Sequence, residues 1–248
     1  MKTSLIRCFV AASCFAFAAP ALAQPVNITK KAVKVGGITP GDTPGFPVTI
    51  TTPGSYRLSG DLVAPAGSHG IVILADDVTI DLNGFSISGP AAPQASTRGV
   101  FAAAGQRRIT VLNGRVSNFG YGILLTGPHS HIQRIVATGN VQDGIYAGYQ
   151  GIVLDCTSMK NGKGISMAQG GVIRGNTVAD NQEQGVWVVG SSLVVGNSVR
   201  NNGSAGLQLD PLSGYADNVL TGNNSGGAQV IGGKQLGANV CGAGPCVP

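Results

Sequence analysis

Three basic side chains in the second half of the chain have the chemistry needed to act on an anionic substrate: Arg134, Lys160 and Arg174. Lysine and arginine hold carboxylates by charge-assisted hydrogen bonds, and they can also take a proton from a carbon next to a carboxylate. We therefore predict that these three residues are catalytic. The alternative is that they form surface ion pairs with Asp155 and Asp180, each contributing less than about 1 kcal/mol.

Three aromatic residues share a second pattern, because each stands two positions after a glycine in an apolar stretch: Phe101, Tyr146 and Trp187. Aromatic faces pack on the apolar faces of sugar rings, so we predict that these residues bind a carbohydrate substrate. An apolar column on the outer face of a sheet can also be an assembly surface. Self-association through this column is the alternative.

Histidine and acidic pairs offer weaker sites for chemistry. His129 and His131 would project from one face of an extended segment and could bind copper or zinc. This pair alone is an incomplete metal site, because the third histidine, His69, is two repeats away. Asp76 and Asp77 are the one adjacent acidic pair in the sequence, and we expect them in a turn, because a hydrolytic site needs several converging carboxylates. The other carboxylates are too scattered for a calcium cage. The sequence therefore predicts no metal site and no cofactor.

These candidate residues belong to a repeating pattern. Glycines open apolar stretches at intervals of 20 to 23 residues, at Gly99, Gly122, Gly144, Gly164, Gly185 and Gly206. After each glycine the first and third residues are apolar, which is the alternation of a β-strand with one buried face. Two more short strands are predicted in each repeat, and no helix. Three short strands per repeat describe one coil of a parallel β-helix, whereas the spacing of a leucine-rich repeat is absent.

Asparagines recur with the same period in two columns. One column is Asn140, Asn161, Asn181, Asn202 and Asn223, and the other is Asn176, Asn197, Asn218 and Asn239. Stacked coils would let each amide bond to the asparagine above and below it, as in a polar ladder. Asparagine also tolerates the left-handed conformation of a corner, and the glycine four residues later would let the chain turn back. We predict that both columns are structural.

The fold predicted from these patterns is all-β: a single-stranded right-handed parallel β-helix of about eight three-strand coils. Residues 70–248 would form this helix with its C-terminal cap. Residues 24–69 would supply N-terminal capping strands, because a solenoid must protect its end strands. Residues 1–23 have the basic start, apolar run and small-residue cleavage site of a secretory signal peptide. We therefore expect an exported protein, periplasmic or extracellular, without a membrane span.

Charge and cysteine content limit the partners and the compartment. Without the signal peptide, 14 lysines and arginines face 11 acidic residues, a mild excess that suits an anionic partner. Basic residues do not alternate with aromatics, so nucleic acid is not an expected partner. Cys241 and Cys246 are close enough for a disulfide bond in an oxidising compartment. Cys156 would then be a free, buried thiol.

Two stretches carry a family resemblance: GIVILADDVTIDLNGFSISG, from Gly70 to Gly89, and ITVLNGRVSNFGYGI, from Ile109 to Ile123. They resemble the first coils of right-handed parallel β-helix proteins of the pectin-lyase-like superfamily, and the resemblance extends over residues 50–240. Members of this superfamily mostly act on polysaccharides as lyases, hydrolases or epimerases, or bind them, and related periplasmic proteins process copper. The resemblance implies the fold more specifically than the chemistry, because one scaffold hosts many functions.

These observations together predict an exported protein that binds an anionic polysaccharide or cleaves it in the manner of a lyase. The first alternative is a non-catalytic structural or surface-interaction protein that assembles through its aromatic column. A weaker alternative is copper handling in the periplasm.

Overall fold

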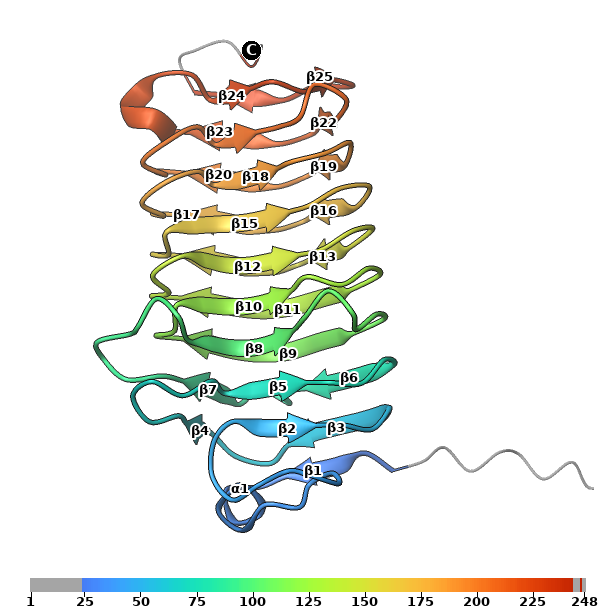
Figure 1. The fold of residues 1–248 in the computed structure, drawn as a ribbon. Coiled ribbons are helices and arrows are strands. Elements are labelled where there is room, and N and C mark those ends of the chain that lie inside the picture. The colour runs from blue at the N-terminus through green and yellow to red at the C-terminus, as the bar shows by residue number, and fades with distance from the viewer. Residues whose placement is uncertain (1–23, 243–245, 247–248) are drawn as a thin grey trace, which may run out of the picture.

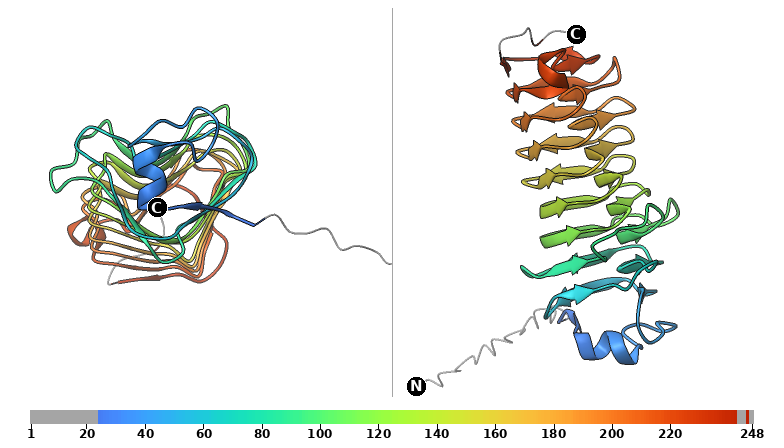
Figure 2. Two further views of the ribbon diagram at one scale, coloured as in Figure 1. Left: turned by 90° about the horizontal axis from the view of Figure 1, so that it is seen from below. Right: turned by 90° about the vertical axis from the view of Figure 1, so that its left-hand side faces the viewer.

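The computed structural model describes residues 24–242 and residue 246. Nine coils stack into a β-helix, with α1 (Lys30–Val35) at its N-terminal end and β24 (Val230–Ile231) and β25 (Lys234–Gln235) at its C-terminal end (Figure 1, Figure 2). The signal peptide predicted for residues 1–23 lies outside the described residues. In the described part of the chain, no helix has the length and apolar character needed to cross a membrane.

One side of every coil contributes a strand to a nine-stranded parallel sheet, which we call sheet B. Its strands, in order along the axis, are β2 (Val48–Ile50), β5 (Ile71–Ile73), β8 (Arg98–Ala102), β10 (Tyr121–Leu125), β12 (Asp143–Ala147), β15 (Lys163–Met167), β18 (Val186–Val188), β21 (Leu207–Gln208) and β24 (Val230–Ile231). Along these strands, side chains alternate between the core and the outer face, so the predicted apolar alternation is confirmed.

The other two sides form a 17-stranded sheet, sheet A, which bends around a corner. Its first row is β3 (Gly54–Leu58), β6 (Val78–Asp81), β9 (Thr110–Ser117), β11 (His131–Thr138), β13 (Ile152–Leu154), β16 (Val172–Arg174), β19 (Leu193–Val195), β22 (Gly214–Ala216) and β25 (Lys234–Gln235). Strands β9 and β11 continue into the second row, with β4 (Leu62–Val63), β7 (Ser86–Ser88), β14 (Thr157–Met159), β17 (Thr177–Ala179), β20 (Ser198–Arg200), β23 (Val219–Thr221) and β26 (Val240–Cys241).

The structure has one coil more than the predicted eight. Strands β2, β3 and β4 fall in the range predicted for capping strands, but they pair in register with β5, β6 and β7 and form the first coil. Beneath them, β1 (Val26–Ile28) pairs with β3, and α1 covers the end of the core with Val33. At the unpaired edge of β2, the Asp42 carboxylate accepts a hydrogen bond from the Thr49 N–H at 2.8 Å. These contacts protect the N-terminal end strands.

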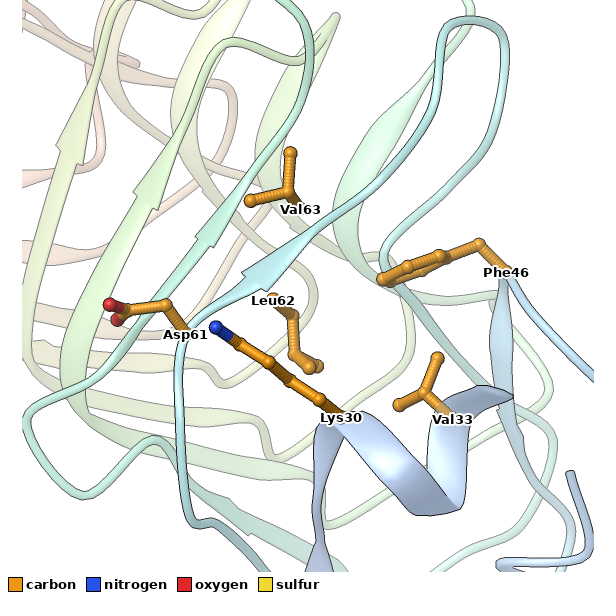
Figure 3. A pocket seen from close by; sticks show the side chains of 6 residues that line it. All are labelled: Lys30, Val33, Phe46, Asp61, Leu62 and Val63. Carbon is orange, nitrogen blue, oxygen red and sulfur yellow. The ribbon is translucent and has the colours of Figure 1, made fainter. Parts of the chain in front are cut away.

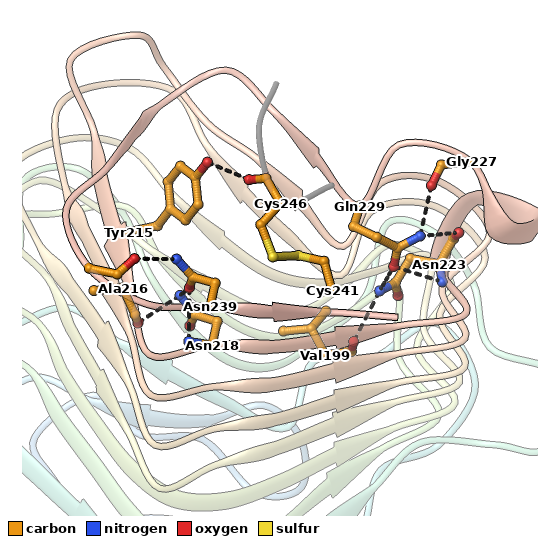
Figure 4. Close-up of a disulfide and its surroundings, with 11 residues drawn as sticks. Val199, Tyr215, Ala216, Asn218, Asn223, Gly227, Gln229, Asn239, Cys241 and Cys246 are labelled. Carbon is orange, nitrogen blue, oxygen red and sulfur yellow. Dashed lines mark hydrogen bonds between the residues drawn. A yellow bond between two sulfur atoms is a disulfide. The ribbon is translucent and has the colours of Figure 1, made fainter. Parts of the chain in front are cut away.

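Both asparagine columns form buried ladders, as predicted. Each Nδ2 donates to the Oδ1 of the next asparagine at 2.8–3.1 Å. The backbone N–H of each ladder residue donates to the same Oδ1. Figure 4 shows the C-terminal ends of both ladders, where Gln229 accepts from Asn223 and ends the first one. The 3-10 turn η1 (Asn223–Gly226) leads to this cap.

The conformation of the corners differs from the prediction. The left-handed residue is the one before the ladder asparagine in every coil except that of Asn239, for example Lys160 (φ 55°) and Asp180 (φ 55°). The asparagines themselves point inward, where their amides need partners. The repeat glycine is required by space and not by a turn, since a Cβ on Gly164 would lie 2.8 Å from the Asn181 Nδ2 and 2.4 Å from a backbone carbonyl of the next coil.

The cysteines are arranged as predicted. Cys241 and Cys246 form a disulfide over the last coil (Figure 4), and Cys156 is free and buried. Cys156 takes the ladder position that precedes Asn176 and accepts the Ile135 N–H on its sulfur at 3.5 Å. Burial raises the pKa of its thiol to about 12. This cysteine is therefore an uncharged core residue.

Candidate binding site on sheet B

The predicted aromatic residues lie in one column on the outer face of sheet B. The strand register pairs Phe101 with Leu124, Leu124 with Tyr146, Tyr146 with Ser166, and Ser166 with Trp187. Each aromatic residue therefore stands two coils from the next, or about 10 Å along the axis. We call these five residues the aromatic column.

A polar column runs beside the aromatic column, one residue before each repeat glycine. Its members from the third coil to the seventh are Arg98, Tyr121, Asp143, Lys163 and Gln184. Every coil in this part of the helix thus offers one polar or charged group and one side chain of the aromatic column. We call the two columns together the binding strip.

Two cations of the polar column lie over aromatic rings. The Arg98 guanidinium carbon is 4.6 Å from the centre of the Phe101 ring, and the Lys163 Nζ is 4.7 Å from the centre of the Trp187 ring. Lys163 also pairs with Glu183 at 3.3 Å. Cation–aromatic contacts contribute about 0.5–1 kcal/mol at exposed sites. They hold both cations at fixed points of the strip, where an anionic ligand can reach them.

Asp143 is the most strongly perturbed acid of the strip. Its side chain is only 6% exposed. Burial raises the pKa of the Asp143 carboxyl to about 6, against the opposing effects of Lys163 and Ser166, and the charge of Glu183 raises it further. Among the described residues, Asp143 has neither an ion pair nor a hydrogen bond that meets ordinary geometric limits. A buried, unpaired carboxyl is costly to keep, and such groups concentrate at functional sites.

Other polar atoms of the strip also lack partners. The Ser166 hydroxyl is fully buried between its column neighbours, and it makes no hydrogen bond that meets these limits, although it is near enough to Asp143 to lower the pKa of that carboxyl. The Arg98 Nε and the Gln184 Oε1 are buried and unbonded as well. Gln106, Ser130 and His131, which lie outside the strip, also have such an atom, so the strip is distinguished by the combination of these groups with the perturbed carboxyl of Asp143.

The loop before β8 borders the strip on one side, and a hollow borders it on the other. The Gln142 amide donates to the Ala95 carbonyl at 3.2 Å, and Tyr121 contacts the same glutamine at 2.7 Å, so the long loop before β8 leans on this side of the helix. At the other end of the sheet B strands, a hollow of about 190 Å³ is lined by Tyr146 and Tyr149 together with Gln169. A chain-like ligand could lie between these two features.

The three predicted catalytic residues lie away from the strip. Arg134 is at the corner of sheet A, where its Nε donates to the Asn113 Oδ1 at 2.7 Å. Arg174 ends β16 of sheet A, and Lys160 is in the turn between β14 and β15. All three are exposed, and none forms an ion pair with a described residue. The structure does not bring them together with the aromatic column, and their catalytic role stays a prediction.

The histidines do not form a metal site in the described chain. His129 has a left-handed backbone (φ 60°), so it and His131 do not share the face of one extended segment. The His69 Nδ1 accepts the Arg98 N–H at 3.1 Å, and burial lowers the pKa of this imidazole. Across residues 24–242 and residue 246, no three His, Cys, Asp or Glu side chains converge as metal ligands.

A second hollow lies at the N-terminal end, between α1 and β4 (Figure 3). It measures about 290 Å³ and is lined by Lys30, Val33, Phe46, Asp61, Leu62 and Val63. Its lining is largely apolar, and its carboxylate is already bonded, since Asp61 accepts from the Ser86 N–H and hydroxyl at 2.8 Å each. This hollow has no unpaired buried group comparable to Asp143.

The polar column follows the repeat and could have been predicted from it. Arg98, Asp143 and Lys163 each stand directly before a repeat glycine, and so belong to one column. The predicted apolar alternation concerns the residues after each glycine and does not include these polar neighbours. The glycine packs closely against the neighbouring coil, which leaves the residue before it as well as the one two after it on the outer face.

Comparison with known proteins identifies the fold family. The family model for the right-handed β-helix region matches residues 54–194, whereas no curated protein matches the chain. Among solved structures, the A-module of the mannuronan C-5 epimerase AlgE4 from Azotobacter vinelandii has a TM-score of 0.52 and 15% identity, covering 82% of this chain and 69% of that chain. The Dettilon tailspike protein has a TM-score of 0.43 and 12% identity, covering 78% of this chain and 58% of that chain.

These likenesses concern the fold. The family match spans more than half of the chain and includes most of the binding strip. It also gives the handedness, and the predicted right-handed β-helix is thereby confirmed. The chain belongs to the right-handed β-helix family.

Proposed function

We propose that this protein is exported and binds an anionic polysaccharide on the outer face of sheet B. The observation that carries the proposal is the aromatic column, in which Phe101, Tyr146 and Trp187 recur every second coil. A flat sheet with regularly spaced rings suits a ligand that is itself regular, and sugar rings pack on aromatic faces. Binding of a globular protein would not require aromatic rings at this regular spacing.

Charge supports an anionic ligand. Arg98 and Lys163 are held over two of the three rings, so a sugar carboxylate or sulfate near either ring would meet a cation already in place. Arginine and lysine bind such groups by charge-assisted hydrogen bonds. The epimerase with a similar fold acts on mannuronan, a polysaccharide, according to its name, which is compatible with a carbohydrate partner for this scaffold.

Cleavage of the ligand, in the manner of a lyase, is the finer form of the proposal. Asp143 is the group in the strip best suited to proton transfer, because its raised pKa lies close to neutral pH. Lys163 faces it from the next strand. Binding alone requires neither feature, so product analysis separates an enzyme from a binding protein.

A panel of alginate, pectate and hyaluronan tests both forms. Calorimetry should detect binding of at least one of them to the mature protein, and Trp187→Ala combined with Lys163→Gln should weaken it at least about tenfold. Arg200→Ala is the matched control, because Arg200 is exposed but lies at the end of β20 on sheet A. Appearance of ultraviolet-absorbing unsaturated ends would establish a lyase. Self-association without binding of any polysaccharide would support the assembly alternative.

A further inference from the structure

The period of the binding strip sets the length of its ligand. Phe101, Tyr146 and Trp187 are separated by two coils each, which gives steps of about 10 Å along the helix axis. Such a step is close to the length of a disaccharide. A linear polysaccharide lying parallel to the axis would therefore place equivalent sugars on successive rings, and two disaccharides would span the strip.

The charges along the strip alternate in sign. One cation lies over the Phe101 ring and the other over the Trp187 ring, and these rings are four coils or about 19 Å apart. Between them, the polar column offers Asp143 beside Tyr146, two coils from Arg98 and one coil from its register partner Lys163. The pattern is cation, acid, cation.

The central acid is almost fully buried beside the aromatic column. Asp143 is more than nine-tenths buried, and Lys163, its neighbour in the register, pairs with Glu183 instead. The Ser166 hydroxyl beside it is equally buried and unbonded. A carboxylate in this setting accepts hydrogen bonds from sugar hydroxyls, but a ligand carboxylate placed against it would leave two like charges in contact.

Building on the proposed function, we propose that the binding strip selects a linear polysaccharide with a carboxylate on about every fourth sugar over one with a carboxylate on every sugar. A sparsely charged chain can place its carboxylates at Arg98 and Lys163 while neutral sugars meet Asp143. A chain charged on every sugar must set one carboxylate against Asp143 in any register. Asp143 is thus a specificity-determining residue that acts by repulsion.

Calorimetry with three polymers at pH 7.5 tests this proposal. The probes are deacylated gellan, with one carboxylate in a linear tetrasaccharide repeat, hyaluronan, with one per disaccharide, and polygalacturonate, with one per sugar. We expect the affinity per binding site to fall in this order, with gellan at least about tenfold tighter than polygalacturonate. Asp143→Asn should strengthen polygalacturonate binding several-fold and leave gellan binding nearly unchanged.

The control variant is Asp180→Asn, which removes an exposed carboxylate at a corner outside the strip and leaves a residue that tolerates the left-handed backbone. Asp180→Asn should change the affinities for gellan and for polygalacturonate only by the effect that the loss of one negative charge has on any anionic ligand. Asp143→Asn can fail to fold, and then the parent protein at pH 5 serves instead, because most Asp143 carboxyls are protonated there. Lys163, Glu183 and Tyr146 are the other ionisable groups that face this carboxyl.

Three results would overturn the selectivity. These are equal or tighter binding of polygalacturonate by the parent protein, an equal change in both affinities in Asp143→Asn, and unchanged discrimination at pH 5. Failure of the folded parent protein to bind any of the three polymers would contradict the proposed function itself, together with the selectivity that rests on it. The two kinds of failure are therefore distinguishable.

Discussion

The asparagine ladders and the binding strip both bury polar side chains, but they treat them in opposite ways. In the ladders every amide meets the next one at hydrogen-bond distance, as between Asn181 and Asn202 at 2.9 Å. In the strip the Ser166 hydroxyl is just as deeply buried, and Asp143 is only 6% exposed, but neither has a hydrogen bond like those of the ladders. Paired polar groups specify a structure, whereas unpaired ones lower stability and persist where a ligand completes them. This difference distinguishes architecture from a site.

Breaking a ladder should have the largest effect on stability. Asn181→Ala removes an amide that bonds the coils on both sides and leaves the Asn161 side chain and the Asn202 Oδ1 short of partners. The loss of such buried bonds should lower the free energy of unfolding by about 2–4 kcal/mol. Chemical denaturation followed by circular dichroism measures it. A loss below about 1 kcal/mol would mean that the ladder is not a main support of the coils.

Removing the charge of Asp143 should act in the opposite direction. The folded-state pKa of about 6 lies above the ordinary value of 3.8, so folding favours the protonated acid. The stability of the parent protein should therefore fall as the pH rises from about 4 to about 6, by roughly 2–3 kcal/mol in total. Asp143→Asn should remove this loss, so the variant should be more stable than its parent at pH 7.5 but not at pH 4.

Denaturation at both pH values checks the sign of this effect. Asp180→Asn again provides the matched control, and its stability relative to the parent should change little between the two conditions. If Asp143→Asn destabilised the protein at pH 7.5, the carboxylate would be a paired structural group like those of the ladders. The contrast between the two regions would then disappear.

The ladder position of Cys156 offers a smaller test. Cys156→Asn would place an amide where the Asn176 Oδ1 already accepts a backbone N–H at 2.9 Å. The ladder would then gain one step, and the expected change is between zero and about 1 kcal/mol of added stability. The comparison variant Cys156→Ala lacks any group to bond, and should be less stable than Cys156→Asn. The reverse order would show that this step of the ladder cannot accept an amide.

Ser166→Ala should have the smallest effect on folding. The hydroxyl has no partner that meets hydrogen-bond limits, so its removal should change the free energy of unfolding by less than about 0.5 kcal/mol. If Ser166 contacts the ligand, the same variant should nevertheless weaken polysaccharide binding in calorimetry. A large loss of stability with unchanged binding would assign this serine to the architecture.

The repeating part of the fold could be predicted from the sequence because one repeat constrains the next. Gly164 and Asn181 recur with the same period since each glycine packs against the asparagine of the following coil, and a pattern imposed by contact remains visible in the chain. The first coil was missed because Pro47 stands at the position equivalent to Gly70, so that no repeat glycine marks this coil. Its strands are identified only by pairing with β5, β6 and β7.

The candidate site could be predicted only in part, because only some of its features follow the repeat. The aromatic column follows the repeat and was found, whereas the importance of Asp143 comes from burial and from the lack of a partner, neither of which a spacing reveals. Arg134 and Arg174 carry suitable charges but stand on sheet A, around a corner from the aromatic rings. Charge alone does not tell on which side of a coil a residue lies.

Fluorescence of the single tryptophan is the most direct test of the binding strip. The sequence contains one tryptophan, and Trp187 stands in the aromatic column with Lys163 over its ring. Titration with a polysaccharide that calorimetry shows to bind should produce a saturable change in Trp187 emission and protect the ring from iodide quenching. The midpoint should match the calorimetric affinity. Binding that leaves both the emission and the quenching unchanged would place the ligand elsewhere and contradict the assignment of sheet B as the binding face.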